Sequence, residues 1–176
     1  MKKKINALIF TLIIPIIGFS QSQFGAGFGL LKSTQDNSQS HYGFEIFGKR
    51  EVTEKVRGVI DLGFYTNTET FSGVVERVDI IPICVGLDYS FLQNKIQPFV
   101  GVNAGLMMAL ISNSFGSGSV FRPVIAPLAG VDYQFGEHFG MNINFKFDFV
   151  FYRDESTTGP DFNTLINPNI GVIYVL

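Results

Sequence analysis

The stretch Met141 to Arg153, MNINFKFDFVFYR, decides the fold class of this chain. Apolar residues occupy every odd position through Phe151, and the even positions between them hold Asn142, Asn144, Lys146 and Asp148. A period of two indicates an extended strand, because successive side chains of a strand point to opposite faces. The stretch therefore predicts a long β-strand with one apolar face and one polar face.

The period alone leaves two environments open for the apolar face. In a soluble barrel or sandwich the phenylalanines would form the core, whereas in an outer-membrane barrel they would meet lipid while Lys146 and Asp148 point into the lumen. At roughly 3.3 Å per residue the stretch spans about 43 Å, which is long for a strand of a soluble domain. Other parts of the chain have to separate these alternatives.

The N-terminal segment MKKKINALIFTLIIPIIGFSQ has the organisation of a secretory signal peptide. A lysine-rich start precedes an apolar run from Leu8 to Phe19, and Ser20 supplies a small residue at the end. Pro15 interrupts the run, which is also shorter than the roughly 20 residues of a membrane helix. We predict that residues 1–20 are a signal peptide cleaved after Ser20 and that residues 21–176 form one outer-membrane β-barrel domain.

Charge and cysteine content restrict the possible partners of the exported chain. Removal of three lysines with the signal peptide leaves 10 of the 13 basic residues against 15 acidic residues, a net charge of −5. No basic patch remains, so nucleic acid is not expected as a partner. Cys84 is the only cysteine and lies in an apolar run. We expect it to be a packed side chain rather than a nucleophile.

The remaining sequence consists of strand patterns separated by turn residues. The eight predicted strands are residues 23–31, 41–50, 55–67, 74–90, 96–110, 121–134, 139–152 and 164–176. Their connections alternate in length. The longer, polar ones are residues 32–40, 68–73, 111–120 and 153–163, and the tight ones are residues 51–54, 91–95 and 135–138.

Long loops at one end and short turns at the other are typical of transmembrane barrels with an even number of strands. We therefore expect an all-β fold, an eight-stranded antiparallel up-and-down transmembrane β-barrel. Both termini would lie on the short-turn side, which is periplasmic in such barrels.

One face of the predicted strands is apolar throughout, and the other mixes charged residues with glycine. The interior of an eight-stranded barrel is narrow and suits small residues and a few polar side chains, so the glycine-bearing face is predicted to point inward. A lysine on the opposite, lipid-facing side would cost roughly 2 to 4 kcal/mol near the midplane. The predicted lipid-facing residues include Phe44, Phe64, Phe145, Phe147, Phe149 and Tyr174.

The charges on the inward face number four acidic and four basic residues. This predicted lumen polar network consists of Glu45, Lys49, Arg57, Asp61, Arg122, Asp132, Lys146 and Asp148. Equal numbers favour a packed, paired network, because unpaired charges in a narrow lumen are heavily penalised. A conduit for protons or small ions along the same residues is the alternative.

The fourth predicted strand has an ambiguous register. Arg77 and Asp79 share odd parity with Ile83 and the other apolar residues that follow, while Asp88 has even parity. Either these two charges lie above the hydrocarbon at the long-loop rim, or a bulge at Pro82 switches the register.

The central segments IPICVGLDYSF, LQNK and IQPFVGVNAGL resemble the central hairpin of the outer-membrane protein β-barrel domain family, the small porin-like barrels with OmpA- and OmpX-like architecture. The resemblance is carried by Ile81, Pro82, Tyr89, Phe91, Lys95, Pro98, Phe99, Gly101 and Gly105. It implies a Gram-negative outer membrane, contact with its lipids, and insertion by the barrel-assembly machinery. Members of the family commonly end in an aromatic residue, whereas this chain ends Tyr174-Val175-Leu176.

The sequence contains no recognisable catalytic, metal or cofactor constellation. His41 lies at the predicted long-loop rim and His138 in a tight turn, so the two histidines are separated by the height of the barrel. The deacylase type of lipid A-modifying barrel uses a neighbouring histidine and serine, which neither position supplies. The glycine series GAGFG lacks a phosphate-loop lysine. We expect a monomeric, non-enzymatic protein without cofactor or metal.

These observations predict a structural or surface-interaction role through the loops around residues 32–40, 111–120 and 153–163, where an unidentified extracellular ligand would bind. Two alternatives remain open. One is a narrow porin-like channel for small solutes or ions, and the other is a soluble exported barrel that binds an apolar ligand.

Overall fold

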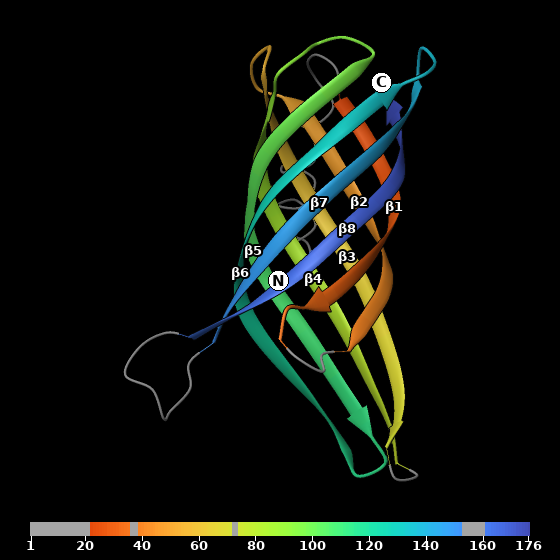
Figure 1. Ribbon diagram of the computed structural model, residues 1–176, viewed down its shortest axis with the longest axis vertical. Coiled ribbons are helices and arrows are strands. Elements are labelled where there is room, and N and C mark those ends of the chain that lie inside the picture. The colour runs from red at the N-terminus through yellow and green to blue at the C-terminus, as the bar shows by residue number, and fades with distance from the viewer. Residues whose placement is uncertain (1–21, 36–38, 72–73, 153–160) are drawn as a thin grey trace, which may run out of the picture.

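The computed structural model describes residues 22–35, 39–71, 74–152 and 161–176, and the predicted signal peptide lies outside them. Eight antiparallel strands close into an up-and-down barrel, in which each strand pairs with its neighbours in the chain and β8 pairs with β1 (Figure 1). The predicted eight-stranded barrel is confirmed. The strands are β1 Ser22–Ser33, β2 Ser40–Glu51, β3 Val56–Phe71, β4 Val74–Ser90, β5 Ile96–Asn113, β6 Gly116–Gln134, β7 Phe139–Tyr152 and β8 Asp161–Val175.

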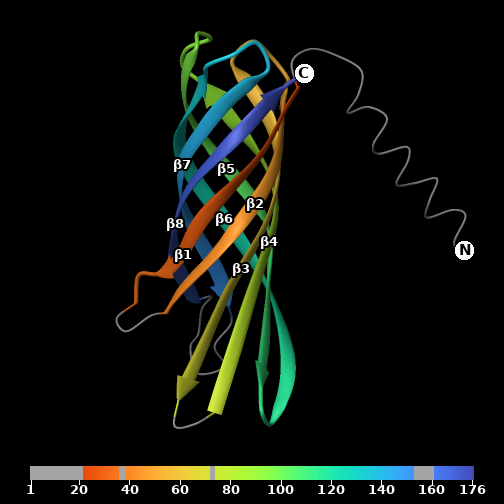
Figure 2. The ribbon, with the colours of Figure 1, turned by 90° about the vertical axis from the view of Figure 1, so that its right-hand side faces the viewer.

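One end of the barrel carries the short turns that connect β2 to β3, β4 to β5 and β6 to β7 (Figure 2). The first and last described residues meet at the same end, where the Leu176 N–H donates a hydrogen bond to the Ser22 carbonyl at 2.9 Å. We call this the short-turn end and the opposite one the long-hairpin end. In the described part of the chain no helix is long and apolar enough to cross a membrane.

The long-hairpin end differs from the prediction. Most of the predicted polar loops 68–73 and 111–120 is strand, because β3 continues to Phe71, β5 continues to Asn113, and β6 begins at Gly116. Asn113 closes the second turn by accepting hydrogen bonds from the backbone N–H groups of Phe115 and Gly116 at 3.0 and 3.1 Å. The polar composition of these two segments suggested loops. Strands that project beyond the barrel are solvated and need no apolar face, so their composition resembles that of loops.

The two projecting hairpins pair with each other. Glu76 of β4 pairs with Asn113 of β5, so β3 to β6 continue beyond the barrel as one four-stranded sheet (Figure 2). Among the described residues, β2 pairs with β3 only as far as Thr66, and β7 pairs with β6 only as far as Val124. Within the part of the chain that the structure describes, the outer strands of this sheet extension, residues 67–71 and 116–123, therefore pair with a neighbouring strand on one side only.

A constant register relates each pair of neighbouring strands. A path that crosses the strands along paired positions from Gln23 returns to β1 at Ser33, ten residues further along the chain. With eight strands this stagger requires a strand tilt of about 40° and leaves an interior just wide enough for side chains.

Three prolines interrupt the ladders without shifting this register. The pairing skips two positions at Pro82 between β3 and β4, at Pro127 between β6 and β7, and at Pro168 between β8 and β1. Proline has no N–H to donate, so these positions lose ladder hydrogen bonds.

The bulge considered at Pro82 is therefore wrong. The ring of Pro82 occupies the space that a Gly63 side chain would fill, which accommodates the proline in a regular strand. Arg77 and Asp79 consequently stay on the outward face, where the Arg77 Nε lies 2.9 Å from the Asp79 carboxylate at the long-hairpin end.

Glycine lines the inner wall where neighbouring strands approach most closely. A Cβ on inward-facing Gly105 would lie 2.0 Å from the carbonyl oxygen of Ile83. A Cβ on outward-facing Gly48 would meet only the Phe24 ring, at 3.7 Å. The inward register of most strand glycines thus follows from backbone contacts within the barrel.

We predict that Gly105→Ala destabilises the barrel by about 1–3 kcal/mol, because the added methyl group overlaps backbone that cannot move independently. Gly48→Ala, the matched control, should leave the free energy of unfolding within about 0.5 kcal/mol of wild type. Urea titration, with folded and unfolded bands separated by gel mobility, measures both. Equal effects of the two substitutions would contradict this account of the inner wall.

Candidate functional site

Seven of the eight residues predicted for the lumen network are buried inside the barrel in two clusters. The first, near the short-turn end, joins Lys49 and Arg57 to Asp88 and Asp132. Asp132 lies 3.0 Å from the Lys49 Nζ and 2.7 Å from the Arg57 guanidinium, and Asp88 lies 3.4 and 3.5 Å from the same groups. This short-turn network contains two cations and two carboxylates, so its formal charge is balanced.

Phe99 adds an aromatic face to the short-turn network. The Lys49 Nζ lies 3.9 Å from the centroid of the Phe99 ring, and the Arg57 Cζ lies 5.0 Å from it. The negative face of an aromatic ring attracts cations, and more strongly when water is excluded. Phe99 is itself buried, so it stabilises both cations where solvent does not reach them.

The second cluster, the central network, is built around Lys146. Its Nζ donates a hydrogen bond to Glu45 at 2.7 Å and another to Asp61. The Tyr65 hydroxyl also donates to Glu45. Asn167 donates to Glu45 at 3.2 Å and, more weakly, to Asp148 at 3.4 Å. Two carboxylates thus bind the one ammonium group and Asp148 lies in the same network without binding it, so the central network carries two formal negative charges in excess.

Two residues depart from the predicted network. Arg122 lies apart from both clusters, over the ring of Tyr152 at 5.1 Å, one inward position beyond buried Val124 on β6. Asp88 was absent from the prediction but belongs to the short-turn network. The even parity that Asp88 shares with Cys84 would have revealed it, had the register at Pro82 been known. The two clusters together contain five acidic and three basic residues.

The lumen is filled by these side chains and by an apolar layer above them. The void that both networks line has a volume of about 20 Å³, room for roughly one water molecule. Towards the long-hairpin end follow packed, buried residues, namely Leu31, Tyr65, Cys84, Met107, Val124, Val150 and Leu165. Charge in the middle of the barrel is therefore separated from the long-hairpin end by apolar packing.

The six residues predicted to meet lipid all lie on the outward face of the barrel, opposite in parity to the buried positions of their strands. Phe44 contacts Phe64 with ring centroids 5.7 Å apart, and Phe145 contacts Phe147 at 5.0 Å. Tyr174 packs against Phe139 at 5.3 Å. These rings, packed against one another on the convex surface, contribute to an apolar exterior.

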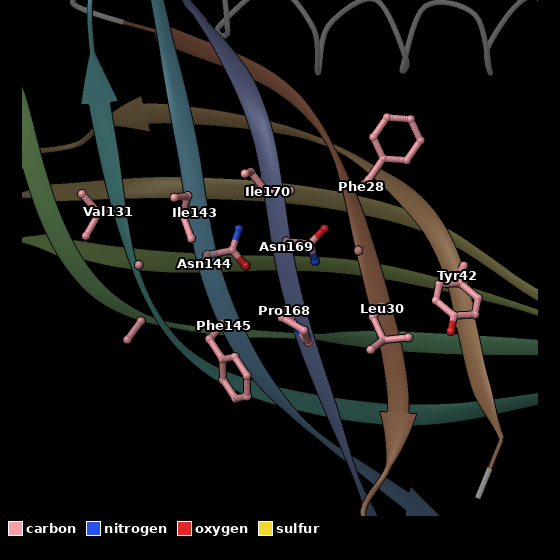
Figure 3. Close-up of a pocket in the computed structure, with 13 residues that line it drawn as sticks. Phe28, Leu30, Tyr42, Val131, Ile143, Asn144, Phe145, Pro168, Asn169 and Ile170 are labelled. Carbon is pink, nitrogen blue, oxygen red and sulfur yellow. The ribbon is translucent and has the colours of Figure 1, made fainter.

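An apolar groove of about 590 Å³ runs over the outside of β8. Figure 3 shows Pro168 and Ile170 of β8 lying between side chains of β1 on one side and of β7 on the other, namely Phe28, Leu30, Ile143 and Phe145. Phe28 is 76 % exposed, the largest exposed fraction among these side chains. Its lining includes Asn144 and Asn169 but none of the charged residues of the two networks.

No three histidine, cysteine or acidic residues among those described are arranged to hold a metal ion. His138 lies in a turn of the short-turn end, with its Nδ1 3.0 Å from the Val175 carbonyl, and His41 lies at the long-hairpin end. The two histidines are placed at opposite ends of the barrel, as predicted.

No protein-family model and no curated protein sequence matches this chain. Among solved structures, neisserial surface protein A (NspA) is similar with a TM-score of 0.70 and 14 % identity, covering 89 % of this chain and 99 % of that one. Ail of Yersinia pestis, the attachment invasion locus protein, has a TM-score of 0.65 and 15 % identity over 89 % and 98 % of the two chains. That structure was solved with the heparin analogue sucrose octasulfate.

The N-terminal β-barrel domain of Pseudomonas aeruginosa OprF is also similar, with a TM-score of 0.52 and 20 % identity over 88 % of this chain and 97 % of that domain. At such identities the likeness is one of fold. It confirms the predicted architecture, that of the eight-stranded transmembrane β-barrels.

Lys146 is predicted to be indispensable to the fold, because it is the only cation of the central network. Lys146→Gln leaves buried carboxylates without a counter-charge and should cost about 3–5 kcal/mol of unfolding free energy. Lys95→Gln in an exposed turn is the control and should change stability by less than about 0.5 kcal/mol. Similar urea midpoints for the two variants would show that the stability of the barrel does not depend on the Lys146 ammonium group.

Removing the charge of Asp148 should have the opposite effect on stability, because its carboxylate adds to the negative charge that is already in excess in the central network. Asp148→Asn is expected to stabilise the barrel by about 1 kcal/mol or more, because it removes a buried charge that Lys146 does not directly bind. Asp132→Asn in the balanced network should destabilise it. Thermal unfolding, followed by the mobility of unboiled protein on a gel, compares them, and a loss of stability in Asp148→Asn would refute the charge excess.

Proposed function

We propose that the protein is an integral outer-membrane barrel of a Gram-negative bacterium, closed to solutes, that acts at the cell surface through its long-hairpin end. One observation carries this proposal. Every charge of the two networks is buried inside, whereas the outward face of the barrel is apolar and aromatic. A barrel with this distribution is suited to hydrocarbon outside and to packed polar side chains within.

The soluble alternative is disfavoured by the same distribution. A barrel in water that carried an apolar ligand would need an apolar lumen, and the centre of this one is filled by charged and amide side chains. Its outward phenylalanines would form an apolar surface far larger than soluble monomers expose. The groove over β8 supports lipid contact, since its apolar walls match the chemistry of an acyl chain (Figure 3).

A channel is also disfavoured, because a conducting lumen requires a continuous polar path. Ion pairs and hydrogen bonds join the side chains of both networks, the void that they line holds about one water molecule, and apolar packing covers them towards the long-hairpin end. We infer that the networks stabilise the barrel rather than conduct. No constellation in the described residues supports an enzymatic role, and the proposed function is a structural or surface-interaction one.

The sheet extension supports a role at the cell surface. It projects beyond the barrel on one side only, and Phe115 at its turn is 86 % exposed. Exposed aromatic residues on a projecting hairpin are suited to contact with another molecule. Of the loops expected to carry specificity, the structure describes residues 111–120 completely, and residues 36–38 and 153–160 lie outside the described residues.

The orientation follows from the sorting of the connections. In transmembrane barrels the short turns are periplasmic and the longer excursions extracellular. We therefore propose that both termini are periplasmic and that the sheet extension faces the medium. Insertion by the barrel-assembly machinery and function as a monomer complete the proposal, because within the described barrel wall every strand is paired on both sides.

Cysteine labelling on intact cells tests location and orientation together. We predict that Ser117→Cys, in the sheet extension, reacts with a membrane-impermeant maleimide on intact cells. Asn94→Cys, in a short turn, should react only after the outer membrane is permeabilised. Wild type is the background control, because Cys84 is buried at 5 % exposure.

Two outcomes would overturn the proposal. Labelling of Asn94→Cys but not Ser117→Cys on intact cells would reverse the orientation. Recovery of either variant as a soluble protein without detergent would remove the membrane location.

A further inference from the structure

The barrel opens at the long-hairpin end into a cavity of about 360 Å³, which we call the mouth cavity. Its walls are mostly apolar, and its floor is the apolar layer that covers the central network. The apolar lining includes Ile80, Met107, Ala109, Ile111, Val120 and Leu165. A volume of this size, lined by apolar side chains at the mouth of a barrel, is within the range of small-molecule sites.

Arg122 supplies the cationic group of the mouth cavity. Its guanidinium lies over the Tyr152 ring at 5.1 Å, which leaves the donor edge of the group for other contacts. Lys49, Arg57 and Lys146, which also point inward, all bind carboxylates. Among the described residues no carboxylate lies within ion-pair distance of Arg122, so this part of the chain supplies no counter-charge to its guanidinium at the edge of the cavity.

We propose that the mouth cavity binds an amphipathic carboxylate, such as a medium-chain fatty acid, with the carboxylate on Arg122 and the chain against the apolar walls. A guanidinium pairs well with a carboxylate because its N–H groups match the two oxygens. The apolar walls favour an aliphatic chain in the ligand, and the positive charge of Arg122 favours an anionic headgroup. Charge complementarity and cavity size thus point to the same class of ligand.

The floor of the cavity determines what happens to such a ligand. Met107, Val150 and Leu165 close the path downward, and the charged central network lies beneath them. The chain of the ligand therefore stops at the apolar layer, and the mouth cavity is a binding site rather than a passage. The proposal goes beyond the surface role above and does not depend on it, because it is tested on isolated protein.

Two methionines provide an internal comparison for the test. Met107 lines the cavity, while Met108, the next residue of β5, has the outward parity of its strand. Octanoate is titrated into methionine-methyl-labelled protein in lipid nanodiscs, and 1-octanol serves as the uncharged probe of the same length. Empty nanodiscs correct for partitioning into lipid. We expect octanoate to shift the Met107 methyl resonance saturably and to leave Met108 unchanged.

Variants then separate the charge from the apolar wall. Arg122→Gln should weaken octanoate binding about tenfold or more, whereas Arg77→Gln, a matched control outside the cavity, should not change it. Ala109→Phe should block binding of both probes by filling the cavity while Arg122 is retained. Each methylene added to the carboxylate should strengthen binding about fourfold until the cavity is full.

The outcomes decide the proposal. Absence of a saturable Met107 shift would overturn the site itself. Equal affinity for octanoate and 1-octanol, unaltered in Arg122→Gln, would overturn the anion selectivity. The mobility of unboiled protein on a gel shows for each variant that the barrel has folded, and if Ala109→Phe does not fold, the comparison of Arg122→Gln with Arg77→Gln still decides.

Discussion

The narrow bore of an eight-stranded barrel is the constraint on which the rest of this structure depends. Eight strands staggered by ten residues leave an interior with room for side chains and little else. Inward positions are therefore divided between glycines, which let strands approach closely, and polar side chains that interlock. Bulky aromatic residues are largely displaced to the outer surface, where space is unrestricted, and that surface becomes apolar as a result.

The way in which the bore is filled separates the barrel into functional zones. The short-turn network is balanced and packs against Phe99, whereas the central network contains three carboxylates and one ammonium, which binds two of them. Both are covered by an apolar layer towards the long-hairpin end, and we infer that they stabilise the wall of the barrel rather than conduct. The mouth cavity and the sheet extension, which these networks do not fill, are the two places where we propose contact with other molecules.

The alternation of residue types was sufficient to predict the strand number, the closed barrel and the inward register of seven charged residues. It could not predict how far the strands continue past the barrel. The residues of the extension are polar, and its strands pair only with one another. Asp88 was missed since one proline made the register of β4 ambiguous. Arg122 was assigned to the network by parity alone, and parity gives the face of a residue but not its height. Arg122 could be placed at the mouth cavity only once its height along the barrel axis was known, and the pairing of the strands in the structure gives that height.

Pro168 has a consequence for how the closed wall comes apart. It lies on the seam where the last strand meets the first, and the seam loses its pairing opposite Leu30 and Leu31. A barrel held together by interstrand hydrogen bonds opens locally first where few of these bonds join two neighbouring strands. Amide hydrogens near Leu30 and Leu31 would then exchange with solvent sooner than those of the seams that no proline interrupts, and β1 and β8 would part sideways towards the acyl chains beside them.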